Sequence, residues 1–91
     1  MITYNLAADG STPEFSSSKN ELVIVIEGDF GSGTAAIQIE GTSTNFVTLA
    51  DGTGTSDFAK RVFAPGNAQL RVNLSGATSP DLNVTVYPVT Q

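Results

Sequence analysis

The residues of this chain that could do chemistry are acids, hydroxyls and a few basic side chains, because the sequence contains no His and no Cys. Without His the chain lacks the usual general base and the commonest metal ligand. Without Cys it has neither a thiolate nucleophile nor a disulfide framework. The serines at 16–18 therefore have no base to activate them. We expect no enzyme activity, no catalytic residue, no cofactor and no transition metal.

Oxygen-bearing side chains recur at alternate positions from Asp51 to Asp57, a stretch that also holds Gly52 and Gly54. Alternating oxygen ligands on a glycine-containing loop suit Ca²⁺, but the acidic residue that would close such a loop is absent. Asp and Gly are also ordinary turn formers. The stretch is interpreted as a turn, with calcium binding as the alternative.

A second acidic group consists of Glu27, Asp29 and Glu40. Paired carboxylates could cleave glycosidic bonds. A chain of 91 residues leaves little room for a substrate cleft, and acids at strand ends are usually exposed to solvent. We therefore expect these three side chains to be solvated.

The basic side chains Lys60, Arg61 and Arg71 lie in the second half of the chain, whereas eight of the nine acids lie at or before Asp57. We interpret the three as a docking patch for an acidic protein surface, since charges at an interface rim steer and orient association. The alternative is a solvated sheet face. Lys60 and Arg61 are neighbours within one expected strand and point to opposite faces, so at most one of them can share a face with Arg71.

Phe30 lies between Gly28 and Gly31 in a glycine-rich turn. An aromatic side chain on such a turn is either an interface anchor or a cap that folds back onto the core. Phe30 thus joins the three basic residues as a candidate for binding a partner. Phe15, in the expected long loop from 7 to 20, poses the same question.

The elements that must position these residues are organised around residues 21–40. An apolar run at 22–26 precedes a reversal at 28–33 with three glycines, and alternating residues at 35–39 follow. The pattern predicts a hairpin of two antiparallel strands. The first strand is apolar on both faces, so we expect it to lie centrally in its sheet.

Five further strands are predicted, at 2–6, 45–49, 57–63, 70–74 and 82–87, although Phe58 and Val62 in the third of them would also suit a helical period. The turn Pro65-Gly66-Asn67 is expected to join the strands at 57–63 and 70–74 as a hairpin. Strands of this length and spacing predict an all-β fold: one small antiparallel β-sandwich domain over residues 1–91, with about seven strands, immunoglobulin-like or jelly-roll-like. The expected core comprises Leu22, Ile24, Ile26, Ile37, Ile39, Leu70, Val72, Leu74, Val84 and Val86.

The net charge of −5 argues against nucleic acid as a partner, because binding to a phosphate backbone needs a basic stripe. The longest apolar run falls far short of the ~20 residues that span a bilayer, so no membrane is expected either. The first four residues lack the charged start of a signal peptide, so none is expected.

Several short motifs between residues 22 and 86 resemble a known family. These are GDFGSGT at 28–34, IQI at 37–39, FVTL at 46–49, LRVNLSGAT at 70–78 and PDLNVTV at 80–86. The pattern resembles small virion proteins of tailed double-stranded DNA bacteriophages. Members of that family are β-sandwiches that decorate or cement the icosahedral capsid.

The resemblance implies a decoration or cement protein that binds the outer capsid surface and bridges neighbouring major capsid proteins as a homo-oligomer, such as a trimer. Its location would be the virion surface, after synthesis in the host cytoplasm. A tail, fibre or head–tail component is the first alternative. A carbohydrate-binding β-sandwich module is the second.

Overall fold

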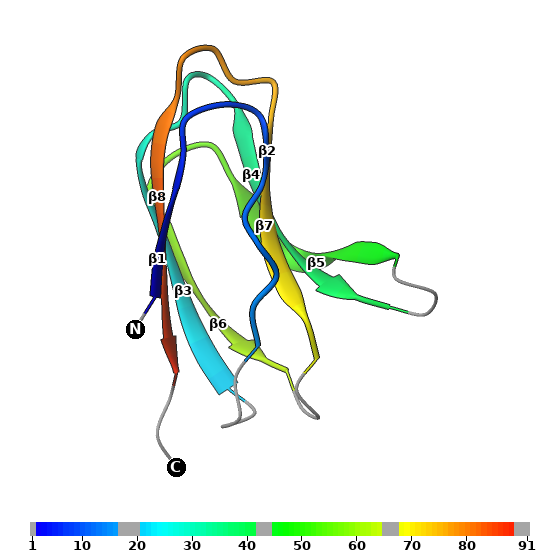
Figure 1. Ribbon diagram of the computed structural model, residues 1–91. Helices are drawn as coiled ribbons and strands as arrows, with labels where there is room; N and C mark the ends of the chain where they lie inside the picture. The colour runs from blue at the N-terminus through cyan, green and yellow to red at the C-terminus, as the bar shows by residue number, and fades with distance from the viewer. Residues whose placement is uncertain (1, 17–20, 42–44, 65–67, 89–91) are drawn as a thin grey trace.

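The computed structural model describes residues 2–16, 21–41, 45–64 and 68–88. These residues form an all-β structure of two four-stranded antiparallel sheets packed face to face (Figure 1). Within the described part of the chain, no helix is long and apolar enough to cross a membrane. The strands are β1 (Ile2–Leu6), β2 (Gly10–Ser11), β3 (Glu21–Asp29), β4 (Thr34–Glu40), β5 (Phe46–Gly54), β6 (Phe58–Phe63), β7 (Leu70–Ser75) and β8 (Asp81–Pro88).

The strand order is β1-β8-β3-β6 in one sheet, called sheet A, and β2-β7-β4-β5 in the other, sheet B. Strands pair antiparallel as β1 with β8, β2 with β7, β3 with β6 and β4 with β5. The chain therefore folds as one long double strand with its tip at β4–β5, and successive pairs alternate between the sheets. This is the arrangement of an eight-stranded jelly roll, the second of the two expected sandwich types.

The core lies between the sheets and is built by the period-2 alternation of the strands. In β3, Leu22, Ile24 and Ile26 are fully buried, while Val23 and Val25 on the outer face are half-buried. This strand lies between β8 and β6, so its expected central position is confirmed. Every expected core residue is buried except Ile39, which is partly exposed and packs against the core.

Two expected hairpins are wrong. β3 belongs to sheet A and β4 to sheet B, so the glycine-rich reversal at 28–33 crosses between the sheets. β6 and β7 likewise lie in different sheets. The turn Pro65-Gly66-Asn67 that was expected to join them is outside the described residues.

β5 is longer than expected because it continues through Asp51-Gly52 instead of ending there. The register with β4 runs from Thr48, opposite Gln38, to Thr53, opposite Ala36. The four residues 49–52 thus bulge out opposite Ile37 alone, and Asp51 adopts a positive φ of 59°. Bulges of this kind bend a strand, and the far end of the β4–β5 pair extends away from the sandwich (Figure 1).

The expected loop at 7–20 contains the short strand β2, which pairs with β7. Pairing resumes beyond it. Thr12 accepts a hydrogen bond from the Val72 N–H at its hydroxyl, and its own N–H donates to the Val72 carbonyl. Phe15 exchanges two backbone hydrogen bonds with Leu70, of 2.8 and 2.7 Å. This segment therefore forms an interrupted edge of sheet B.

Candidate functional site

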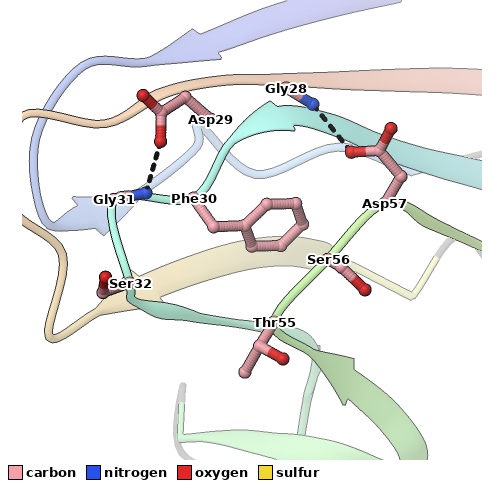
Figure 2. Close-up of a pocket in the computed structure, with 8 residues that line it drawn as sticks. All are labelled: Gly28, Asp29, Phe30, Gly31, Ser32, Thr55, Ser56 and Asp57. Atoms are coloured by element: carbon pink, nitrogen blue, oxygen red, sulfur yellow. Dashed lines mark hydrogen bonds between the residues drawn. The ribbon is translucent and has the colours of Figure 1, made fainter.

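Four connections cross between the sheets at one end of the sandwich, called here the crossover end. They are residues 7–9, 30–33, 55–57 and 76–80, seen at the top of Figure 1. A shallow depression of about 630 Å³ lies between two of them. Figure 2 shows its lining: Gly28, Asp29, Phe30, Gly31, Ser32, Thr55, Ser56 and Asp57.

The two carboxylates of the depression accept hydrogen bonds from backbone N–H groups (Figure 2). Asp29 accepts one from Gly31 at 2.8 Å, and Asp57 accepts one from Gly28 at 3.0 Å. The first bond holds the β3–β4 turn and the second ties the β5–β6 connection to β3. Both acids therefore have a structural role that requires no substrate.

A third carboxylate also accepts hydrogen bonds from backbone N–H groups, and it ties the other two connections together. Asp9 accepts hydrogen bonds from the N–H groups of Gly76 at 3.1 Å and Ala77 at 2.8 Å. The N–H of Thr78 donates to the carbonyl of Gly31 at 2.8 Å. A Cβ on Gly31, whose φ is +59°, would lie 2.6 Å from the Thr78 carbonyl oxygen. The crossover end is thus a network of tied loops.

Phe30 lies beneath this network with its side chain 5% exposed, and it belongs to the hydrophobic core. Its ring points into the space between the two connections (Figure 2). Of the two interpretations of this residue, the structure supports the cap that folds back onto the core. Phe15, also 5% exposed, behaves likewise and stacks on Tyr4 with ring centroids 5.9 Å apart.

A second candidate surface is the outer face of sheet A. Two large apolar side chains on it are exposed, Phe63 at 69% and Tyr87 at 44%. Tyr87 is in register with Val23, and Phe63 with Glu21. With Val25 and Ala59 in the adjacent row, they form an apolar strip on the half of the face away from the crossover end. The strip is defined as Val23, Val25, Ala59, Phe63 and Tyr87.

Arg61 lies on the same face as the apolar strip, in register with Val23. Its guanidinium donates a hydrogen bond to Glu21 at 2.9 Å. This hydrogen bond and the negative charge of Glu21 raise the pKa of Arg61. Because the Arg61 side chain is 67% exposed, the pair is screened by water and adds little to stability. It does fix a cation beside the apolar strip.

Arg71 lies on the opposite side of the molecule, on the outer face of sheet B. Its Nε donates to the Gln38 Oε1 at 2.7 Å, and its guanidinium carbon lies 4.1 Å from the centre of the Phe46 ring. Arg61 and Arg71 are therefore held on opposite faces of the sandwich.

Lys60 is on neither outer face. It is in register with the buried Ile24 and lies on the core-facing side of β6 together with Val62. Its side chain is half-buried, as expected for an aliphatic stem along the core with its ammonium reaching water. The three basic residues consequently do not form one patch, and the expected hairpin that would have brought them together is absent.

The acidic candidates do not converge either. Glu27 and Asp29 lie on β3 near the crossover end, whereas Glu40 ends β4 in the other sheet. From Asp51 to Gly54 the proposed calcium-binding stretch is strand, and Asp57 is engaged with the Gly28 N–H. Among the described residues, no three His, Cys, Asp or Glu side chains form a group that could hold a metal ion.

Sequence reasoning missed Phe63 and Tyr87 as surface residues. Phe63 follows Val62 directly in an expected strand, so one of the two had to face outward. Leu82, Val84 and Val86 form the buried side of β8, and Tyr87 lies on its other side. Both signals were readable, but assigning the exposed side required knowing which neighbours cover each face.

No family model, no curated protein and no solved structure matches this chain.

Proposed function

We propose that this chain is a non-catalytic capsid decoration or cement protein of a tailed double-stranded DNA phage, which binds the outer surface of the capsid and bridges neighbouring major capsid proteins. The proposal combines the resemblance of residues 22–86 with the nature of the exposed surface. The observation that carries it is the apolar strip on the outer face of sheet A. Its two aromatic side chains, exposed beside an ion-paired Arg61, have the composition of a protein-binding surface.

The jelly roll is compatible with this role, since it occurs in viral capsid domains. It also occurs in lectins, so the fold alone does not decide the function. In a shell, mass action would stabilise a small folded domain. The virion surface is the corresponding location, after synthesis in the host cytoplasm.

The sites of contact are proposed to lie on the half of the sheet A face that carries the apolar strip. Glu27, Asp29 and Asp81 on the other half of that face would repel an acidic neighbour. A capsid surface with an apolar area, an acidic group opposite Arg61 and Lys or Arg opposite Glu27, Asp29 and Asp81 would fit this distribution of charge.

The experiment is quantitative mass spectrometry of purified virions of the source phage. A copy number on the order of hundreds per particle is expected for decoration, whereas about six or twelve copies would indicate a ring in the tail or head–tail connection. Absence from particles would refute a virion role.

Variants of the two outer faces then test the surface. Phe63→Ser and Arg61→Glu should lower occupancy on particles and release the protein at lower salt. Arg71→Glu on the opposite face is the matched control and should leave occupancy unchanged. If Arg71→Glu is the variant that dissociates, sheet B carries the contact and the assigned face is wrong.

A specific observation also favours carbohydrate binding as a second candidate: the polar depression at the crossover end. Hydroxyls of Ser32, Thr55 and Ser56 line it together with two carboxylates. Such groups can bind sugar hydroxyls. Glycan-array screening of the purified chain tests this, with Ser56→Ala as the control for any glycan found.

A further inference from the structure

The four edge strands of the sandwich differ in how they are protected against pairing with another strand. Natural sheets protect their edges by short strands, Pro, bulges or charges that point inward. β2 has two residues and is followed closely by Pro13. β5 has the bulge at 49–52, and β6 carries the half-buried Lys60 on its core-facing side. Three edges are therefore protected.

β1 has none of these features. Its five residues pair without interruption with β8 on one side, and they include no Pro, no charge and no bulge. In the described part of the chain no strand pairs with its other side. Ile2, on the core-facing side in register with Val86, remains 49% exposed. β1 is thus the edge of this molecule best suited to accept a strand.

The residue pattern of β1 indicates which strand fits. Ile2, Tyr4 and Leu6 face the core, and Thr3 and Asn5 face outward. When two copies lie antiparallel about a two-fold axis at Tyr4, apolar residues stand opposite apolar ones, and Thr3 stands opposite Asn5. The strand is self-complementary on both faces, and it brings no like charges together in a chain of net charge −5.

We propose that two copies of this chain associate through antiparallel β1–β1 pairing, which joins their A sheets into one eight-stranded sheet. Each Ile2 then packs against the other copy at the level of Leu6. The two-fold pairing closes after two copies, in contrast to the trimer that the resemblance implies. This inference does not depend on the capsid function, because it rests on the edge strands alone.

Sedimentation velocity of the purified chain tests the association. Five paired residues make a small interface, so we expect weak dimers. The fraction of dimer should rise with protein concentration and be detectable before the concentration reaches about 1 mM. A chain that stays monomeric up to that concentration overturns the proposal.

Single cysteines test the edge and the register, and the native chain has no Cys to interfere. Thr3→Cys mixed with Asn5→Cys should give a covalent dimer on non-reducing gels, because opposite residues of an antiparallel pair lie within the reach of a disulfide. Either variant alone should remain a single chain, because its cysteines would lie far apart in this register.

Ala59→Cys is the matched control, since Ala59 ends the same cross-sheet row as Thr3 at the opposite edge. It should not cross-link. Dimers that cross-link through Ala59→Cys, or through Thr3→Cys alone, would overturn the β1 pairing in this register.

Discussion

Ile24 is the position at which the energetics of this sandwich can be tested most directly. It is fully buried in the central strand of sheet A, in register with Val86 on β8 and Lys60 on β6. Ile24→Ala removes three carbons, which is about 2.4 kcal/mol of transfer free energy at about 0.8 kcal/mol each. The cavity that remains raises the expected loss to about 3–4 kcal/mol.

This loss is large for a chain of this size, whose free energy of unfolding should be about 5–14 kcal/mol. Urea denaturation followed by circular dichroism measures it, with an unchanged slope showing that the unfolded state is the same. Ile24→Val should cost about 0.5–1.5 kcal/mol and remains measurable if the Ala variant does not fold.

Val25→Ala is the matched control, because Val25 follows Ile24 in the same strand and its side chain is half-buried on the outer face. We expect it to cost about 1 kcal/mol or less. If Ile24→Ala costs no more than Val25→Ala, the core does not lie between the sheets as described, and the assignment of faces is refuted.

Three further predictions concern the loops and edges. Asp9→Ala should lower the free energy of unfolding by about 1–2 kcal/mol through loss of two hydrogen bonds, and Asp9→Asn by less, since one acceptor oxygen remains; equal urea midpoints for both variants and the wild type would contradict this role. Gly31→Ala should cost more than Gly76→Ala in the same assay. Both glycines have positive φ, but only at Gly31 would a Cβ clash, with Thr78. Lys60→Met should increase self-association in light scattering, because β6 loses the inward charge that protects its edge, whereas unchanged scattering would mean that the charge is not protective.

The strands and the core could be predicted because both follow from local periodicity. Leu70 and Val72 alternate with polar neighbours, and the buried side of their strand is readable without knowing any partner. Ile39 departs from the pattern for a non-local reason: it lies beyond the bulge opposite Ile37, where the β4–β5 pair extends away from the body.

Which strands pair could not be predicted in the same way. The sequence from Gly28 to Gly33 signals a reversal, but a hairpin and a crossing between sheets use the same turn residues. What distinguishes them here is Phe30, whose ring enters the core between the sheets. That contact involves residues distant in the sequence, so no local pattern reports it. The same limit applied to Arg61 and Arg71, whose opposite faces follow only from the topology.

The jelly-roll topology also explains why negative charge gathers at the crossover end. Backbone N–H groups in and beside these connections need hydrogen-bond acceptors, and the carboxylates of Asp9, Asp29 and Asp57 accept their hydrogen bonds. Glu27 and Asp81 lie beside them on β3 and β8. Five of the nine acids are thus placed at or near one end. A protein partner meets less desolvation and less repulsion at the other half of sheet A, which is where the exposed aromatic side chains lie. Under the proposed function, the residues that tie the loops would therefore also direct a partner to the apolar strip.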